Sequence, residues 1–378
     1  MLKRVLLIGY YGMRNTGDNA FLSVMLDGIT KYLRPDECLI TAPRIPETKL
    51  WRMGRPIFAS RQLVRGENRY LRMYYYSYRS DTIIVGGGSV FHSVAGIQDK
   101  LRIITLGKKK IVVGMGLSLG PFENKSAEAL CAQWLNRAHF VGVRDTRSLE
   151  IARTIAPKAN VVKTFDLAAQ LIRNVTFCEG QKRRGLGLAL CGWEKFTVGG
   201  IINEPIQRKK VINLLKKILV SRNIEELVLL NFNGHKYYGD NSVHLEIKEA
   251  LKSFVPVRLV QYSPDPMIFL NEIARLRGIV AMRLHAAVFA YLTKTPAIIV
   301  SYHPKCREWA NEIGLSSSWI LDSPGFSEEL LSSRIESIFN GDYGFPSLLL
   351  NSAVELSMKN WDWVSDFIND GANNFRNV

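Results

Sequence analysis

An arginine and a histidine two positions apart carry the clearest signal for chemistry in this chain. Arg283 and His285 stand in the run Ala-Met-Arg-Leu-His-Ala at residues 281–286, where an apolar strand gives way to an apolar helix over residues 287–292. Residues two apart do not face each other on a regular helix, so a common site requires Arg283 in the turn and His285 in the first helical turn. A guanidinium binds carboxylates or phosphates through a planar fork, and an imidazole transfers protons near neutral pH. We therefore predict anion binding and general acid–base catalysis here, with a purely structural histidine as the alternative.

A second polar cluster follows the next apolar strand, expected over residues 297–300. It reads Ser301-Tyr302-His303-Pro304-Lys305, and proline suits the first turn of the helix that would follow. Tyr302 and Lys305 would add a hydrogen-bond donor and a cation on the adjacent loop. Lys305 either neutralises a phosphate there or is a solvated lysine at a helix start.

The first loop of the chain is rich in glycine and lies between an expected strand at residues 4–9 and an expected helix. It reads Gly-Tyr-Tyr-Gly-Met-Arg-Asn-Thr-Gly-Asp-Asn over residues 9–19. Glycines let the backbone approach a ligand closely, and the N–H groups of a helix start favour an anion or a hydroxyl-rich group. The glycine spacing differs from the dinucleotide fingerprint, which disfavours NAD. The alternative is a tight turn in which Asp18 caps the helix.

Two further expected strands end in glycines or polar residues. The strand at residues 82–85 is followed by Gly86, Gly87, Gly88 and Ser89, and the strand at residues 140–143 is followed by Arg144. The guanidinium of Arg144 could offer a planar fork to a carboxylate or phosphate. A structural contact with its neighbour Asp145 is the alternative.

Short Val, Ile and Leu runs alternate with amphipathic segments along the whole chain, which predicts an α/β protein with buried parallel strands. Besides those above, strands are expected at residues 110–114, 185–190, 227–230, 257–260 and 278–281. A length of 378 residues exceeds what one hydrophobic core usually serves, so two domains are expected.

The polar, charged stretch at residues 174–184 is the expected linker between the domains. Residues 1–175 would form an N-terminal Rossmann-like domain. Residues 185–378 would form a C-terminal Rossmann-like domain, with C-terminal helices that pack back on the first domain. Loops after the strands of the two halves would then face each other across a cleft.

The composition limits the class of protein. With 47% hydrophobic and 22% charged residues the chain is an ordinary folded protein, and its net charge of +16 favours anionic partners. The 5 cysteines show neither metal-type nor disulfide spacing, which is typical of reduced thiols in the cytoplasm. No apolar run reaches the roughly 20 residues that cross a bilayer.

Taken together, these motifs resemble the polysaccharide pyruvyl transferase family, in the same order and over residues 5–314. The most specific elements are the Arg-Leu-His-Ala segment and the first loop. The resemblance implies two Rossmann-like domains facing a cleft, as in GT-B glycosyltransferases, with residues 1–175 on the acceptor side and residues 185–378 on the donor side. It also implies transfer of pyruvate from phosphoenolpyruvate to a sugar of a cell-surface polysaccharide, or of its lipid-linked precursor, with formation of a ketal and release of phosphate.

The same resemblance implies roles for residues of this chain. Arg283 and His285 match the donor-binding and catalytic pair. The donor-binding residues would be Arg144, Arg283, Leu284, His285, Tyr302 and Lys305. The acceptor-binding or cleft loops would contain Gly12, Arg14, Asn15, Gly17, Asp18, Gly87, Gly88 and Ser89. Asn19 stands where many relatives have an acidic residue, which bears on the identity of the acceptor. No metal and no cofactor is required.

Two other functions compete with this one. The first is a nucleotide-sugar glycosyltransferase on the same architecture, because a fold does not fix a function; the paired glutamates of such enzymes are absent at their characteristic spacing between Asp265 and Gly325. The second is a nucleic-acid-binding protein, suggested by the net charge and by the Tyr- and Arg-rich residues 69–79. That segment would equally suit helix packing or peripheral contact with an anionic membrane at the inner face of the plasma membrane.

Overall fold

The computed structural model describes residues 4–43, 57–59, 67–106, 110–173, 175, 177, 182–192, 200–221, 224–323 and 327–374. The chain divides into two compact units. The first contains the chain up to Met13, Asp18–Arg173 and the C-terminal part from Asn351. The second contains Arg14–Gly17 and the chain from residue 174 to Leu350. Four residues of the first loop therefore pack with the second unit, and the predicted linker lies largely outside the described residues.

Among the described residues of the first unit, seven parallel strands form one sheet in the order β3-β2-β1-β4-β5-β6-β7. The strands are β1 (Arg4–Ile8), β2 (Glu37–Thr41), β3 (Ile57–Ala59), β4 (Thr82–Phe91), β5 (Ile111–Leu119), β6 (Phe140–Val143) and β7 (Val161–Lys163). The helices are α1 (Thr16–Gly28), α2 (Glu67–Arg79), α3 (Val94–Thr105), α4 (Lys125–Leu135), α5 (Thr146–Ile155) and α12 (Leu350–Asn374), with short turns η1 (Ile29–Leu33) and η3 (Leu167–Ile172). The strand order reverses direction beside β1, as in doubly wound sheets.

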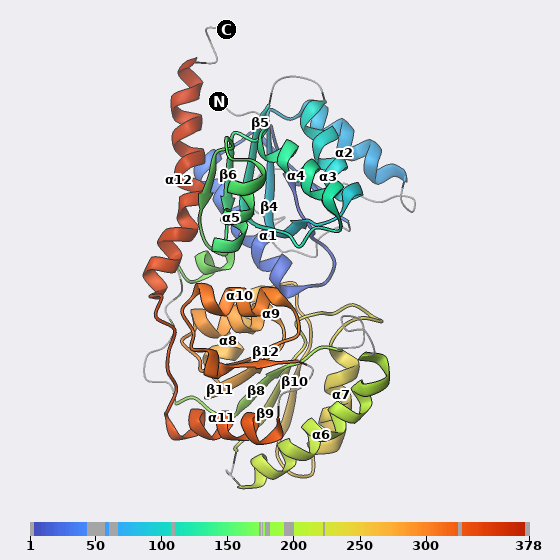
Figure 1. The fold of residues 1–378 in the computed structure, drawn as a ribbon, viewed down its shortest axis with the longest axis vertical. Helices are drawn as coiled ribbons and strands as arrows, with labels where there is room; N and C mark the ends of the chain where they lie inside the picture. The colour runs from blue at the N-terminus through green and yellow to red at the C-terminus, as the bar shows by residue number, and fades with distance from the viewer. Residues whose placement is uncertain are drawn as a thin grey trace. The chain divides into compact units, whose positions relative to one another are not determined.

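The described part of the second unit has a sheet of six parallel strands in the order β10-β9-β8-β11-β12-β13. The strands are β8 (Leu186–Ala189), β9 (Leu227–Leu230), β10 (Val257–Val260), β11 (Gly278–Ala281), β12 (Ala297–Ser301) and β13 (Ile320–Asp322). The helices are α6 (Gly200–Ser221), α7 (Asn241–Leu251), α8 (Pro266–Ala274), α9 (Leu284–Leu292), α10 (Pro304–Glu312), η4 (Ser317–Trp319) and α11 (Glu328–Asn340). This is the strand order of dinucleotide-binding domains, and helices flank each sheet (Figure 1).

The strands form where apolar runs are bounded by polar or glycine residues. Strands β8, β9 and β11 are buried at every position, as expected for parallel strands covered on both faces. Helix α9 is buried at all but one of its positions, His285. It therefore forms part of the core of the second unit, and its first turn is fixed by the packing of the rest.

Three expectations about the first unit are wrong. Strand β5, expected over residues 110–114, continues through Gly114 and Gly116 to Leu119. Strand β4 does not end before its glycines: it runs through Gly86, Gly87 and Gly88 to Phe91. Gly87 and Gly88 have positive φ, and Phe21 occupies the space that a Cβ on Gly87 would need. Helix α1 begins at Thr16, so Asp18 lies in its first turn instead of capping it.

The C-terminal helix α12 packs on the first unit (Figure 1). The indole N–H of Trp361 donates to the side-chain oxygen of Gln170 at 3.0 Å, and its ring stacks on Tyr32 at 5.5 Å. The side-chain oxygen of Asn360 accepts the backbone N–H of Gly116 at 3.1 Å. These contacts join the last helix to η3, η1 and strand β5. None of the described helices has the length and apolar content that crossing a membrane requires.

Candidate functional site

The carboxyl ends of β8, β9, β11 and β12 meet at one edge of the second sheet, where ligands of open α/β sheets commonly bind. The loops that follow these strands carry Cys191, Asp240, Arg283, His285 and Tyr302. All of these residues belong to the second unit. We call this set of loops the β11 edge.

The junction between β11 and α9 has the predicted geometry. Arg283 is the residue before the helix, with φ −72° and ψ 125°, and His285 lies in the first helical turn. The sequence expectation that the pair straddles a strand-to-helix turn is therefore confirmed. Both side chains are partly exposed, whereas Leu284 between them is buried.

Arg283 is held by a buried carboxylate. Its Nε donates to Oδ1 of Asp240 at 2.9 Å, and its Nη2 donates to the same oxygen. Asp240 has no exposed surface, and its Oδ2 accepts the backbone N–H of Asn233 at 2.9 Å. Among the described residues, Asp240 bonds to Arg283 only at Nε and Nη2, and no hydrogen bond is formed by Nη1. The arginine side chain keeps 16% of its surface exposed.

Burial and charge act against each other in this pair. Burial raises the pKa of the Asp240 carboxyl, and the guanidinium of Arg283 opposes that rise. Burial alone would lower the pKa of Arg283, but Asp240, together with smaller effects of Cys191 and Tyr302, outweighs burial and raises the pKa. Arg283 therefore stays cationic, and Asp240 needs it as a partner.

A buried histidine lies next to this pair. The backbone N–H of Leu190 donates to Nε2 of His244 at 3.1 Å, so Nδ1 carries the proton and donates to the side-chain oxygen of Asn231 at 2.6 Å. The amide nitrogen of Asn231 in turn donates to Asn241 and Gln261. Burial, with a smaller contribution from the charge of Arg283, lowers the pKa of His244 to about 3. This neutral histidine ties the loop after β8 to that after β9.

The first loop contacts His285 directly. A Cβ on Gly17 would lie 2.0 Å from Nδ1 of His285, so the imidazole packs against the bare Cα of this glycine. The backbone N–H of Gly17 donates to the side-chain oxygen of Asn15 at 3.0 Å. Only a glycine at this position leaves room for the ring, which explains one glycine of the first loop in physical terms.

The loop after β9 contacts Arg14–Gly17, the four residues of the first loop that belong to the second unit. Asn15 pairs with Asn233 in an antiparallel bridge. The backbone N–H and the hydroxyl of Thr16 both donate to the carbonyl of Phe232, at 2.9 and 3.0 Å. The guanidinium of Arg14, which has a positive φ of 57°, lies 5.0 Å from the centre of the Tyr262 ring. Within the second unit, the structure thus brings Arg14, Asn15 and Gly17 together with His285.

The loop after β12 adds Tyr302 and Lys305 to the β11 edge. His303 caps helix α10, because its Nδ1 accepts the backbone N–H of Lys305 at 3.3 Å. Burial raises the pKa of the Tyr302 phenol, which keeps its proton and remains a hydrogen-bond donor. Burial also raises the pKa of the Cys191 thiol to about 12, a rise that the cations Arg283 and Lys305 oppose. The charges of Arg283 and Lys305 therefore both act on the Cys191 thiol, although the three residues come from different loops.

The remaining predicted site residues belong to the first unit. Arg144 is buried, with Nη1 donating to Asp166 and Nε donating to Ser118, both at 2.9 Å. Its Nε also lies 3.8 Å from a carboxylate oxygen of Asp145. Gly87 and Gly88 are buried in β4, Ser89 is exposed, Gly12 has a positive φ of 76°, and Asp18 is partly buried in α1. Within its unit, Arg144 thus makes structural contacts with two carboxylates.

Sequence reasoning missed Asp240, Asn231 and His244. Asp240 precedes helix α7, where an aspartate is commonly a helix cap, and it lies 43 positions from Arg283. One signal could have drawn attention to it. The run Asn-Phe-Asn-Gly-His at residues 231–235 directly follows an apolar strand, as the other loops of the β11 edge do.

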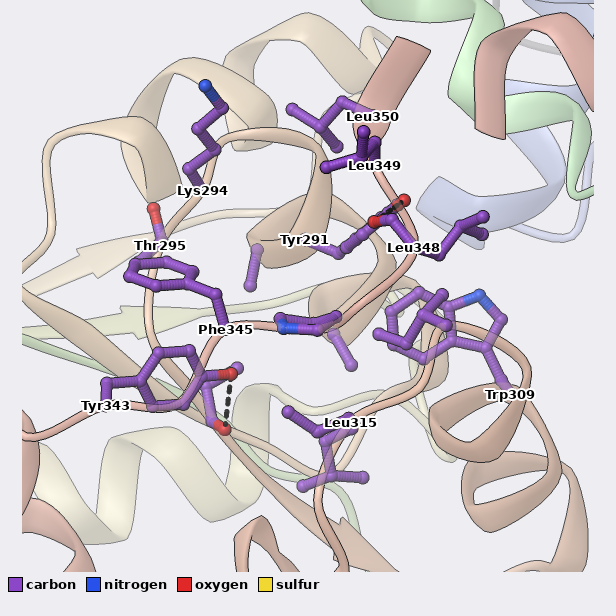
Figure 2. A pocket seen from close by; sticks show the side chains of 16 residues that line it. Tyr291, Lys294, Thr295, Trp309, Leu315, Tyr343, Phe345, Leu348, Leu349 and Leu350 are labelled. Atoms are coloured by element: carbon purple, nitrogen blue, oxygen red, sulfur yellow. Dashed lines mark hydrogen bonds between the residues drawn. The ribbon is translucent and has the colours of Figure 1, made fainter. Parts of the chain in front are cut away.

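A cavity of about 200 Å³ lies on the other side of helix α9. Successive residues of an α-helix are about 100° apart, so Ala287, Ala290 and Tyr291, which line the cavity, face away from His285. Figure 2 shows the rings of Trp309 and Phe345 around it, together with leucines of the segment before α12. None of the predicted site residues lines this cavity, so it is separate from the β11 edge.

The described residues contain no group of three or more His, Cys, Asp or Glu side chains that could hold a metal ion. Cys38, Cys131, Cys191 and Cys306 are buried free thiols, whereas Cys178 lies outside the described residues.

Comparison with known families and structures agrees with the fold. A family model described as polysaccharide pyruvyl transferase matches residues 15–304. No curated protein matches the sequence. A putative UDP-N-acetylglucosamine 2-epimerase from Listeria monocytogenes is similar in structure, with a TM-score of 0.67 and 12% identity over 97% of each chain.

Two other solved structures are similar along their whole length. The UDP-GlcNAc 2-epimerase from Methanocaldococcus jannaschii has a TM-score of 0.59 and 12% identity, over 94% of this chain and 98% of that one. The lipopolysaccharide outer core galactosyltransferase WaaB has a TM-score of 0.54 and 13% identity, over 97% of this chain and 99% of that one. Such low identities show the fold alone. The predicted fold, two Rossmann-like domains as in GT-B enzymes, is confirmed.

Proposed function

The chain belongs to the polysaccharide pyruvyl transferase family, and we propose that it transfers pyruvate from phosphoenolpyruvate to a sugar of a cell-surface polysaccharide or its lipid-linked precursor. The product is a pyruvyl ketal that bridges two hydroxyls, and phosphate is released. The observation that carries the proposal is the β11–α9 junction. There a fixed arginine precedes a histidine whose ring packs against Gly17 of the first loop.

The donor carries a phosphate and a carboxylate, and the β11 edge offers cations and hydrogen-bond donors for both. Nη1 of Arg283 would bind one of these anionic groups, because the other two nitrogens are occupied by Asp240. Tyr302, Lys305 and the first turn of α9, at Leu284, would contribute further contacts. Arg144, from the first unit, is the remaining proposed donor-binding residue. Asp240 acts as a positioning residue, because it fixes the plane of the guanidinium.

The reaction itself requires two proton movements. Protonation of the methylene carbon of phosphoenolpyruvate makes the adjacent carbon electrophilic, and one acceptor hydroxyl attacks it. The carbon–oxygen bond to phosphate then breaks, and the second hydroxyl closes the ketal ring. One hydroxyl proton balances the proton added to carbon, and the other balances the phosphate that leaves. His285 supplies or removes a proton in these steps as a general acid–base.

We assign the acceptor to the loops that the resemblance indicates. Within the second unit these are Arg14, Asn15 and Gly17, which already contact the β11 edge. In the first unit they are Gly12, Asp18, Gly87, Gly88 and Ser89. Backbone and side-chain groups of this kind suit the hydroxyls of a sugar.

The protein would work in the cytoplasm, at the inner face of the plasma membrane. The net charge of +16 favours an anionic lipid surface. Tyr75 and Tyr78 of α2 expose 54% and 65% of their surface, which suits an interfacial position. Co-sedimentation with vesicles that contain phosphatidylglycerol should weaken as salt rises. Binding that ignores both salt and anionic lipid would exclude this contact.

The function is tested by measuring phosphate release from phosphoenolpyruvate with and without a panel of oligosaccharides and lipid-linked oligosaccharides. Release should require an acceptor, because hydroxyl attack precedes phosphate departure. Mass spectrometry should show a product that is heavier by one carboxyethylidene group and carries one new negative charge. Release without any acceptor would indicate a phosphatase, and a nucleotide by-product from nucleotide sugars would indicate a glycosyltransferase.

A further inference from the structure

Two neighbouring tyrosines are strongly exposed beside the candidate site. Tyr237 and Tyr238 keep 74% and 62% of their surface exposed. They lie on the loop between β9 and α7, which we call the Tyr237 loop and define as residues 233–239. Large aromatic side chains bury much apolar surface when a partner is present. The position and rigidity of this loop indicate what that partner is.

The backbone of the Tyr237 loop is fixed by its own hydrogen bonds. Nδ1 of His235 accepts the backbone N–H groups of both Tyr237 and Tyr238, at 3.2 and 3.1 Å. The backbone N–H of His235 donates to the side-chain oxygen of Asn233 at 2.9 Å, and that of Gly239 donates to the carbonyl of His235 at 2.9 Å. The two tyrosines are therefore presented on an ordered turn.

The planes of the rings are also held. The imidazole of His235 stacks on Tyr238, with ring centres 4.8 Å apart and an interplanar angle of 14°. The ammonium of Lys236 lies 5.3 Å from the centre of the Tyr237 ring. A platform that is ordered before it binds loses little conformational entropy on binding.

Both ends of the Tyr237 loop belong to the candidate site. Asn233 pairs with Asn15 of the first loop, and Asp240 directly follows Gly239 and holds Arg283. The loop also follows the carboxyl end of β9, at the same edge of the sheet as the β11–α9 junction. Tyr238 is thus followed by Gly239 and then by Asp240, which holds Arg283, the arginine that we propose for binding the donor.

We propose that Tyr237 and Tyr238 form a stacking platform for a pyranose ring of the acceptor. One face of a pyranose presents C–H groups with partial positive charge, which match the negative face of an aromatic ring. The phenol hydroxyls can exchange hydrogen bonds with the hydroxyls of the sugar. This inference rests on the proposed function only in taking a glycan as the acceptor.

The test is direct binding of methyl pyranosides of glucose, galactose, mannose and N-acetylglucosamine, measured by saturation-transfer NMR with the full chain. At least one should bind, and Tyr237→Ala or Tyr238→Ala should weaken its affinity by about 2- to 13-fold, the range that aromatic ring contacts supply. Tyr237→Phe and Tyr238→Phe keep the ring and should retain most of the binding. Phe254→Ala is the matched control. Phe254 is 48% exposed but precedes β10, at the opposite edge of the sheet, so this change should have no effect.

Three outcomes would overturn the platform: no pyranoside bound by the parent, equal binding by the alanine variants, or an equal loss in Phe254→Ala. Its failure is distinguishable from failure of the proposed function. If pyranosides bind through the tyrosines but phosphoenolpyruvate yields no ketal, the platform stands and the pyruvyl transfer is wrong. If ketal forms while the alanine variants keep the parent's KM for the acceptor, the platform is wrong and the transfer stands.

Discussion

Replacing Arg283 by methionine tests whether the buried pair with Asp240 shapes the site. The change keeps an apolar stem and removes the guanidinium, which leaves a carboxylate with no exposed surface and no cation. Removal of one partner of a buried ion pair costs about 3–5 kcal/mol. We therefore expect Arg283→Met to lower the free energy of unfolding by that amount near neutral pH.

The loss should also depend on pH. Burial raises the pKa of Asp240, and Arg283 opposes the rise, so the pKa rises further in the variant. A carboxyl with a raised folded pKa binds a proton that the unfolded chain, with a pKa of about 3.9, has already released. The contribution of such a carboxyl to the free energy of unfolding is therefore fully present below its unfolded pKa and is lost as pH rises through its folded pKa. The deficit of Arg283→Met relative to the parent should be smaller at about pH 5 than at about pH 8.

Urea unfolding followed by circular dichroism at the two pH values measures this deficit. Arg258→Met is the matched control, because Arg258 pairs with Glu272 at 2.8 Å but is 44% exposed, and an exposed pair contributes only about 0–1 kcal/mol. The double variant Arg283→Met with Asp240→Leu should recover part of the loss, since no charge then remains buried. A deficit below about 1 kcal/mol, or one that is equal at both pH values, would refute the reasoning.

Three further predictions concern other positions. Gly17→Ala would place a Cβ 2.0 Å from Nδ1 of His285, so acceptor-dependent phosphate release should fall by about 10²-fold, with an unchanged circular dichroism spectrum; a parent-like rate would contradict the packing. Burial holds the pKa of His244 at about 3, below its unfolded value of about 6.5, so stability should fall as pH drops between these values, and His244→Gln should flatten that dependence in urea titrations. Trp361→Ala removes a fully buried indole that bonds to Gln170 and should cost about 3–5 kcal/mol; an unchanged thermal melting temperature would show that α12 does not depend on it.

Five of the six strands described in the second sheet were expected from the sequence, and β13 was not. Strands β9, β10 and β11 begin and end at the expected residues. β9 and β11 are short apolar runs, and β10 is a Val-Arg-Leu-Val segment with a single polar residue. The glycines of β4 were misread. Glycine usually ends a strand, but here the ladder continues past Gly88, which pairs with Leu117, to Phe91, which pairs with Leu119. The positive φ of Gly87 and Gly88, together with the packing of Phe21 against Gly87, explains why glycines stand inside the strand.

The site could be predicted only where its residues are local in sequence. Arg283 and His285 were found because a polar pair interrupts an apolar strand and helix. Asp240 could not be paired with Arg283 in this way, since nothing in its local sequence indicates a partner that follows a distant strand. The contact between Gly17 and His285 likewise joins residues that are far apart in the sequence, near the two ends of the segment that the family model matches. Pairings between distant loops depend on the strand order, which periodicity does not determine.

The central claim is ketal transfer with His285 as the general acid–base. The most direct measurement incubates the parent chain and His285→Ala with phosphoenolpyruvate labelled with ¹³C in its three-carbon unit and an oligosaccharide acceptor, and analyses the glycan by mass spectrometry and NMR. The parent should produce a glycan that carries the labelled carboxyethylidene group as a ketal. Folded His285→Ala should form it about 10²- to 10⁴-fold more slowly, as expected for a lost general acid–base. An unlabelled glycan from the parent would contradict the transfer, and a variant rate within about tenfold of the parent would contradict the role of His285.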